Sequence, residues 1–259
     1  MTALPGLTPA ITMSATEKAQ RFLGSAYDAV NGVLTSLDTV CEARGRTRGR
    51  LTSNEEDLLR AAIVFAGAGL DATVKQLLRH ALPVLLDSGN PQATEKFETF
   101  AVGRVGADAE PRHLARYLTA VNPRSALIED YVYALTGSSL QSAEEMSNAA
   151  GALGVAERGL RRDINGLREP FFKARNKVAH ELDLSHPERP GDRSRAGRGT
   201  GETVTMCHEA LDVTQRLINE VSVCLRAARA AAASPTPATK PATAKKATAK
   251  KATAKKAGG

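Results

Sequence analysis

The sequence predicts an all-α protein on three observations. Apolar residues recur at helical spacing over residues 14–230, capping residues and glycines bound those stretches, and no alternating segment bounded by hairpin turns occurs. Hydrophobic residues make up 42% of the 259 residues, enough to bury a core. We therefore expect an antiparallel helical bundle with extra short helices over 14–230, a flexible N-terminus over 1–13 and a disordered tail over 231–259.

The first long helix is expected from Ser14 to about Ala43. Ser14 and Glu17 have the spacing of a capping box, in which two side chains satisfy free backbone N–H groups. Gly45 and Gly49, within the segment RGRTRGR, then end the helix. Its apolar face would consist of Phe22, Leu23, Ala26, Val30, Val33, Leu34 and Leu37.

A second long helix is expected from about Asn54 to Asp87. Ser53 and Glu56 form a second predicted capping box, and Pro83 should kink or end the helix because it lacks a backbone N–H. The segment Ala66–Ala72 (AGAGLDA) has unusually small side chains. Glycine inside a helix costs about 1 kcal/mol relative to alanine, so we expect a packing reason, namely the close approach of another helix.

Shorter helices should follow over 91–104, 111–120, 124–136 and 140–153, separated by glycines. Another long helix is predicted over 157–182, bent at Pro170. An Arg-, Gly- and Pro-rich loop, HPERPGDRSRAGRGTG, then leads into a last helix over about 202–232.

Composition excludes several classes of protein. No run of apolar residues approaches the 18 that a membrane-spanning helix needs, and residues 1–13 carry neither a basic region nor the long apolar run of a secretory signal. The three cysteines (Cys41, Cys207 and Cys224) are far apart and lack a CxxC pair, so neither a disulfide framework nor a structural zinc site is indicated. We expect a cytoplasmic protein without a metal or cofactor.

The positive charge is confined to the C-terminal tail. Residues 231–259 hold seven lysines and no acidic residue, which accounts for the formal net charge of +7 and leaves 28 basic and 28 acidic residues in 1–230. The tail resembles the Lys/Ala-rich tails of bacterial histone-like proteins and linker histones. It is expected to attract DNA or RNA phosphates without sequence preference, or else only to solubilise the chain, through Lys240 and the pairs Lys245, Lys246, Lys250, Lys251, Lys255 and Lys256.

One motif near the end of the 157–182 helix points to chemistry. Arg175 and His180 have R-x4-H spacing, and Asn176 follows the arginine directly. With these residues the chain resembles the HEPN superfamily, in particular its RiboL-PSP-type members, over about residues 50–230. The small patch Gly69–Ala72, the segment SALIEDYVYALTGSSLQSAEE (residues 125–145) and a closing helix add to the resemblance.

The resemblance implies a metal-independent endoribonuclease with no cofactor, in a toxin–antitoxin or antiviral defence role. His180 would act as general acid or base for attack by the RNA 2′-OH, and Arg175 would stabilise the phosphate charge. Asn176 would orient the histidine or bond a phosphate oxygen. DNA lacks the 2′-OH and should not be cut. The partners that the resemblance implies are an RNA substrate and an antitoxin or regulatory protein.

Helix geometry limits how the motif works. Positions i and i+5 lie about 140° apart on a helix, whereas Asn176 and His180, at i and i+4, lie about 40° apart. One straight helix therefore does not focus Arg175 and His180 on one phosphate. Either the helix unwinds near His180, or a second copy supplies the missing group. The resemblance implies the second answer, a homodimer through the motif face.

Other candidates surround the motif. Two loops with several arginines are candidate RNA paths, or ordinary solvated loops. Asp71 is a candidate to orient the motif, and His186 a candidate to assist it. The loop arginines are Arg44, Arg46, Arg48 and Arg50 in the first loop and Arg189, Arg193, Arg195 and Arg198 in the second.

Three alternatives stay open at this stage. Arg175 can pair with Glu181 while His180 only caps carbonyl groups. The chain can be a non-catalytic HEPN adaptor that dimerises or binds a partner. It can also be a nucleoid-associated protein that binds nucleic acid through its tail.

Overall fold

The computed structural model describes most of the chain, and the all-α class is confirmed for that part. Within it every regular element is helical, and the only β-type pairing is an isolated bridge between Leu184 and Arg195. The described residues are 2–45, 49–106, 110–155, 158–189 and 191–233.

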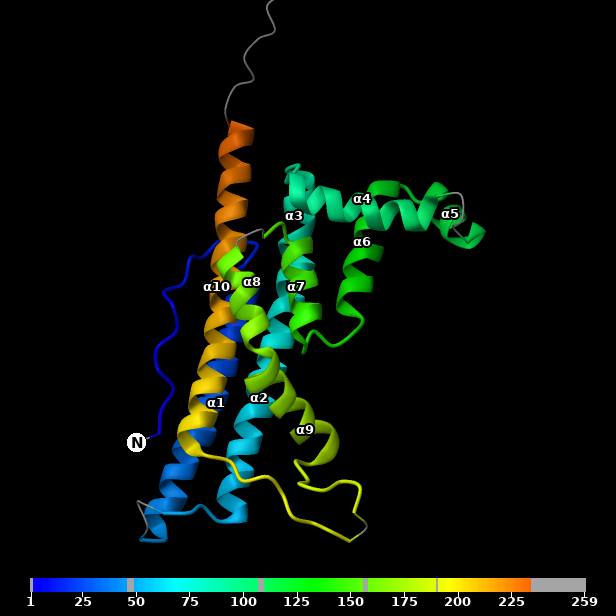
Figure 1. Cartoon of the computed structure of the whole chain (residues 1–259). Coiled ribbons are helices and arrows are strands. Elements are labelled where there is room, and N and C mark those ends of the chain that lie inside the picture. The colour runs from blue at the N-terminus through cyan, green and yellow to red at the C-terminus, as the bar shows by residue number, and fades with distance from the viewer. Residues whose placement is uncertain (1, 46–48, 107–109, 156–157, 190, 234–259) are drawn as a thin grey trace, which may run out of the picture.

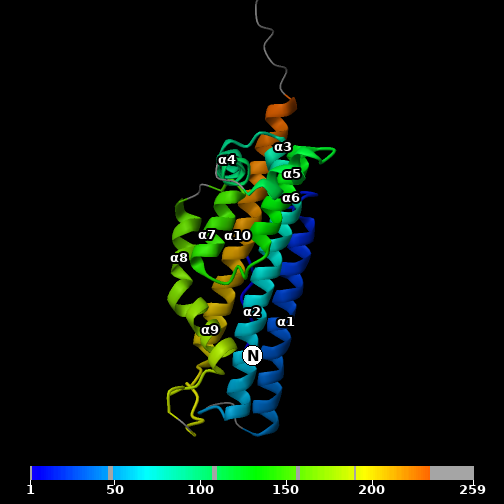
Figure 2. The same cartoon turned by 90° about the vertical axis from the view of Figure 1, so that its right-hand side faces the viewer.

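Three long helices form the body of the molecule: α1 (Glu17–Ala43), α2 (Ser53–His80) and α10 (Thr200–Ala233). They lie side by side along the long axis (Figures 1 and 2). The close approach of another helix, expected at the small side chains of Ala66–Ala72, is confirmed for α1. A Cβ at Gly69 would lie 2.1 Å from Cβ of Ala26, so only glycine allows these two helices to come this close.

Both predicted capping boxes need correction. The N-cap of α1 is Thr16, and its side chain makes no capping bond. At α2 the box is one residue earlier than expected: Thr52 N donates to Glu55 Oε2 over 2.7 Å, and Glu55 N donates to Thr52 Oγ1 over 3.4 Å. Thr52 and Ser53 are both good N-caps, so sequence alone does not choose between them.

The predicted break near Pro83 is confirmed, because α2 ends at His80 and the short α3 (Leu82–Asp87) begins with the proline in its first turn. Together, Ser53–Asp87 is long and apolar enough to cross a membrane by length and composition. More than half of its most apolar window is buried in the bundle, as in the core helix of a soluble protein.

The helices α4 (Pro91–Val105), α5 (Pro111–Leu118) and α6 (Pro123–Thr136) form an arm that projects from one end of the bundle (Figure 1). Each helix starts with a proline, where the missing N–H is not needed. Asp130 ties the arm together: it is 7% exposed and accepts a hydrogen bond from Tyr117 Oη over 2.6 Å. The next helix, α7 (Ala143–Ala152), returns to the bundle.

The predicted helix over 157–182 is three elements. They are α8 (Arg158–Gly166), a π-helical turn (Arg168–Lys173) and α9 (Ala174–Glu181). Pro170 lies inside the π-helical turn, so the expected disturbance is more severe than a bend. Phe172 N donates to Leu167 O over 2.9 Å, five residues back, which is the bond that defines a π-turn.

The segment over 1–13, expected to be flexible, contacts the bundle in its described part, residues 2–13. Residues 2–13, called the N-terminal strap below, have no regular secondary structure but lie along α1 and α10 (Figure 1). Leu4 is 5% exposed and belongs to the core. The strap is held by side chains of helices far away in sequence, which local composition does not reveal.

Candidate functional site

The π-helical turn sets the position of α9 and its motif. Phe171 and Phe172 are buried, with ring centroids 5.4 Å apart in an edge-to-face arrangement, and they anchor the turn in the core. One turn later, Ala174 and Val178 continue this buried stripe. The motif side chains therefore project from the remaining surface of a short helix that is fixed at its N-terminal end.

Arg175 lies against α2 at a second glycine of the small segment. A Cβ at Gly67 would lie 3.0 Å from Arg175 Cγ and 3.4 Å from its Nε. The side chain is half-buried there, and its Nε has no hydrogen-bond partner within the described part of the chain. The alternative in which Arg175 pairs with Glu181 is not what this geometry shows: Arg175 Nη1 donates to Asn176 Oδ1 over 2.8 Å.

Asn176 and His180 share an open pocket of about 660 Å³. Its walls are the start of α7, the π-helical turn and one face of α9. Both side chains are exposed, and Arg175 is not among the described residues that line the pocket. This agrees with the helix geometry, which places Asn176 and His180 on one face and Arg175 on another.

The pocket carries mixed charge rather than a purely basic lining. Its basic side chains are Arg168, Lys173 and Lys177, and its acidic ones are Glu144, Glu169 and Glu181. Lys173 Nζ lies 2.8 Å from Glu169 Oε2, and each partner stabilises the charged form of the other: the pKa of Glu169 is lowered and that of Lys173 is raised. Both are well exposed, so this pair adds little stability.

The backbone turns sharply straight after the motif. Leu182 and Asp183 adopt φ of 50° and 59°, the only positive values at non-glycine residues in the described chain. Leu182 N and Asp183 N both bond Lys177 O, which closes the end of α9. The helix thus ends one residue after His180, and the turn directs Asp183 into the protein.

Asp183 is the centre of a buried ion cluster. Its side chain is fully buried, and it accepts hydrogen bonds from Arg60 Nε over 3.0 Å and from Arg198 Nε and Nη2 over 2.8 and 2.6 Å. Asp57 extends the cluster, because Arg60 and Arg195 both donate to it. We call these five residues the Asp183 cluster: Arg60, Asp57, Asp183, Arg195 and Arg198.

The cluster keeps its carboxyl groups ionised. Burial alone raises the pKa of Asp183, but hydrogen bonds from Arg198 and Arg60 outweigh it, and the pKa is lowered. Asp57 behaves in the same way: burial raises its pKa, but the hydrogen bonds from Arg195 and Arg60 outweigh this effect, and the pKa is lowered. Arg60 is only 5% exposed. Burial lowers its pKa, but its hydrogen bonds to Asp183, Asp57 and Glu56 outweigh this effect, and the pKa is raised.

The second loop of arginines divides into two pairs. Arg195 and Arg198 were predicted to bind RNA, but in the structure both guanidinium groups are engaged inside the Asp183 cluster. Arg189 and Arg193 are exposed, and Arg193 lines a neighbouring pocket of about 640 Å³. These two remain available to a ligand. The six tail lysines predicted to bind nucleic acid (245, 246, 250, 251, 255 and 256) lie outside the described residues.

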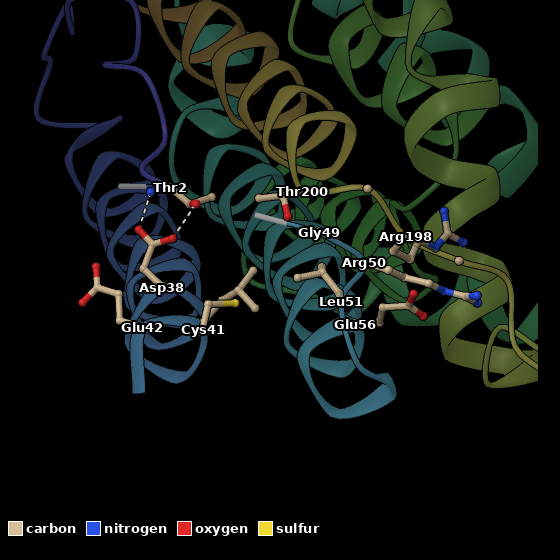
Figure 3. Close-up of a pocket in the computed structure, with 13 residues that line it drawn as sticks. Thr2, Asp38, Cys41, Glu42, Gly49, Arg50, Leu51, Glu56, Arg198 and Thr200 are labelled. Carbon is tan, nitrogen blue, oxygen red and sulfur yellow. Dashed lines mark hydrogen bonds between the residues drawn. The ribbon is translucent and has the colours of Figure 1, made fainter. Parts of the chain in front are cut away.

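The first loop of arginines borders another pocket, of about 600 Å³, between the ends of α1 and α2 and the segment before α10 (Figure 3). Arg50 and Arg198 line it together with the acidic Asp38, Glu42 and Glu56, so its charge does not favour phosphate. Arg44 instead pairs with the buried Glu55 over 3.0 Å. Residues 46 and 48 lie outside the described chain.

Two other predicted candidates lie apart from the motif. Asp71 accepts from Leu140 N over 2.7 Å and pairs with Lys75 over 2.9 Å, so it fixes the connection between α6 and α7 rather than contacting Arg175 or His180. His186 lies 3.6 Å from Glu188 and does not line the His180 pocket.

Sequence reasoning missed Gly67, Arg60 and Asp183. The small side chains of Ala66–Ala72 are evident in the sequence, but nothing local indicates that Arg175 packs there. Arg60 and Asp183 are 123 positions apart, and their pairing has no periodic signature. The one usable signal was an acidic residue directly after a helix C-terminus, beside a loop of arginines.

Comparison with protein-family models, with curated proteins and with solved structures finds no match to this chain. Within the described residues no group of three or more His, Cys, Asp or Glu side chains is placed to hold a metal ion. The three cysteines are free thiols.

Proposed function

We propose that the chain is a metal-independent endoribonuclease of the HEPN type, with Asn176 and His180 as the catalytic face of α9. One observation carries the proposal. Two motif side chains share one open pocket, and the third, Arg175, holds the amide oxygen of Asn176 at 2.8 Å. That bond leaves the Asn176 amide N–H groups free to point at a phosphate oxygen or at His180.

The reaction suits an exposed imidazole. Neutral His180 takes the proton of an RNA 2′-OH while the 2′-oxygen attacks the adjacent phosphorus. The bond to the 5′-oxygen breaks, that oxygen takes a proton from water, and His180 returns its proton to the solvent. The products are a 2′,3′-cyclic phosphate and a 5′-hydroxyl end. Lys173 and Lys177, which line the same pocket, are placed to offset charge on the phosphate.

The proposal includes a second copy of the chain. Arg175 does not line the pocket of its own copy, and its Nη1 is engaged by Asn176. We propose that a face-to-face pair of α9 helices brings Arg175 of one copy to the cleft that holds Asn176 and His180 of the other. Leu182, directly after α9, is 70% exposed and supplies apolar surface beside the motif for such a contact.

The test is RNA cleavage by the purified full chain in EDTA, on tRNA and mRNA with DNA of matched sequence. We expect cleavage of RNA alone and a loss of about 10²-fold or more for His180→Ala. His186→Ala is the matched control, because this histidine is near in sequence but outside the pocket. Equal activity of His180→Ala and wild type would overturn the assignment.

The same experiment separates the alternatives. Removal of residues 231–259 should leave cleavage intact and weaken only salt-dependent binding. No cleavage with normal dimer formation would favour an adaptor. No cleavage, with binding of DNA and RNA alike that depends on 231–259, would favour a nucleoid-associated protein.

A mixing experiment tests the second copy. Arg175→Ala and His180→Ala chains, each inactive alone, should regain part of the activity when mixed, because one composite site then has both groups. Continued inactivity of a mixture that forms heterodimers would contradict the shared cleft.

A further inference from the structure

Backbone groups of the N-terminal strap make most of its hydrogen bonds to the bundle. In the described chain no backbone–backbone hydrogen bond involves residues 2–12. Side chains of α1 and α10 instead bond several of their N–H and C=O groups, among them the N–H groups of Leu4, Thr8 and Ile11. A groove holds an extended peptide in this way, through bonds to its main chain.

The α1 side of the groove contacts the first strap residues. Asn31 Oδ1 accepts from Leu4 N over 2.8 Å, and Tyr27 Oη lies 3.1 Å from Leu4 O and 3.2 Å from Pro5 O. Asp38 accepts from both the N–H and the hydroxyl of Thr2 (Figure 3). Later strap residues bond earlier α1 residues, so the strap and α1 run antiparallel.

The α10 side contacts the second half. Asp212 Oδ1 accepts from Thr8 N over 2.7 Å. Asn219 makes a two-point contact with the strap backbone: its Nδ2 donates to Pro9 O over 2.9 Å, and its Oδ1 accepts from Ile11 N over 2.8 Å. A side-chain amide used in this way recognises an extended main chain without regard to side-chain identity.

The spacing of the groove matches an extended chain. Asp212 and Asn219 lie two helical turns apart on one face of α10, an axial rise of about 10.5 Å. Their strap partners, Thr8 and Ile11, are three residues apart, which spans about 10 Å when extended. A helical segment of the same three residues would span only about 4.5 Å and would miss one partner.

The side chains of the groove are also held by bonds that do not involve the strap. Gln215 of α10 and Gln20 of α1 bond each other at 2.7 and 3.0 Å, and Gln215 Nε2 also donates to Asn219 Oδ1 over 3.1 Å. Gln215 is 1% exposed and Asn219 is 7% exposed. These helix-to-helix bonds hold the Asn219 amide in place, and such preorganisation lowers the cost of binding a segment.

The strap itself has the properties of a separable ligand. It contributes one buried apolar anchor, Leu4, while Pro5, Gly6, Pro9 and Ala10 are exposed. Two prolines keep it from forming a helix and reduce the entropy that an extended segment loses on binding. Its junction with α1 is a fixed pivot, because Thr16 is fully buried and its Oγ1 lies 3.1 Å from Ser222 Oγ.

We propose that the channel between α1 and α10 is a peptide-binding groove. It accepts an extended, non-helical segment with one apolar anchor from a partner chain, and the N-terminal strap occupies it in cis until displaced. The groove lies on α1 and α10, whereas the motif projects from α9, so this inference does not depend on the proposed nuclease activity. The covalent link gives the strap an effective concentration that a competing segment must exceed.

The experiment opens the strap in the full chain and supplies the same segment in trans. Leu4→Asp removes the anchor, and a labelled peptide of residues 1–13 is titrated into this variant and into wild type, with fluorescence anisotropy as the readout. We expect saturable binding to the opened variant and at least tenfold weaker binding to wild type. A peptide carrying Leu4→Asp should lose binding, whereas one carrying Ala10→Asp, at an exposed position, should keep it.

A groove substitution shows where the peptide binds. Adding Asn219→Ala to the opened variant should weaken peptide binding at least tenfold, while Asn165→Ala, on the exposed surface of α8, should not. A second opened chain, with residues 3–9 replaced by alternating Gly and Ser, covers the case in which Leu4→Asp misfolds. Failure of a folded, opened chain to bind the peptide, or binding that ignores Asn219→Ala, would overturn the proposal.

Discussion

The N-terminal strap and the loop between α9 and α10 (residues 182–199) are both irregular, yet they are attached to the bundle in opposite ways. In the strap, helical side chains bind the backbone of the irregular segment. In the loop, the irregular segment supplies its own charged side chains, Asp183 and Arg195, to α2, and Arg198 of the same loop bonds Asp183. Apart from its anchor Leu4, the strap should therefore tolerate changes in its own sequence, whereas the loop should not.

The largest expected effect is on the loop. Asp183→Ala leaves Arg60 and Arg198, 5% and 11% exposed, without their central partner. Removing one member of a buried ion cluster costs about 3–5 kcal/mol. Urea unfolding should show this loss, and Asp192→Ala, in the same loop but bonded only locally to Ser194, should show far less. Equal losses of unfolding free energy in Asp183→Ala and Asp192→Ala would show that the buried ion cluster does not hold the loop.

Acid should release the loop before the middle of the strap. The pKa of Asp183 is lowered in the fold, so its contribution is complete above the unfolded value of 3.8 and is lost as pH falls through the folded pKa. Leu4 and Ile11 are held by neutral amides and lack this dependence. Hydrogen exchange between pH 6 and pH 2 should show earlier deprotection of Ala196 N, which bonds Asp183 O, than of Leu4 N and Ile11 N.

The acid comparison has an internal control at the start of the strap. Burial raises the pKa of Asp38, but its bonds from Thr2 lower it overall. Thr2 should therefore behave like the loop rather than like Leu4 and Ile11. Simultaneous deprotection of all strap amides and the loop would instead mean that acid unfolds the bundle as a whole.

A smaller loss is expected when the groove loses its two-point contact. Asn219→Ala leaves Pro9 O and Ile11 N without their partner, a cost of about 1–3 kcal/mol. Limited proteolysis should show cleavage within residues 2–13 while the bundle remains intact. A variant that resists cleavage there as well as wild type would show that the amide is dispensable.

The smallest effect is expected for a change in the strap's own side chains. Gly6→Ala adds a methyl group with no atom within 4 Å, so stability should change by no more than about 0.5 kcal/mol. The same substitution at Gly69 places a Cβ 2.1 Å from Ala26 Cβ and should cost about 1–3 kcal/mol. Thermal unfolding of both variants measures the difference.

The sequence predicted what depends on local periodicity. The all-α class, the order of the helices and the break near Pro83 follow from spacing and from proline, and all are found. The shared face of Asn176 and His180 follows from i,i+4 geometry. The fold of the bundle as a HEPN domain remains a prediction.

What depends on distant pairs was not predictable. The strap is held by Asp212 and Asn219, about 200 positions away, and composition alone suggested flexibility. Arg195 and Arg198 look like free loop cations until Asp57 and Asp183 are known to lie beside them. In each case a local pattern gave the residue's chemistry but not its partner.

The π-helical turn before α9 has a consequence for how the motif face is aimed. A turn with a bond five residues back contains one residue more than an α-helical turn, so it shifts the phase of everything that follows. Deleting one residue there would rotate α9 by about 100° relative to α8 and carry Asn176 and His180 away from their pocket. The direction in which the motif faces is thus set by a count of residues in the turn.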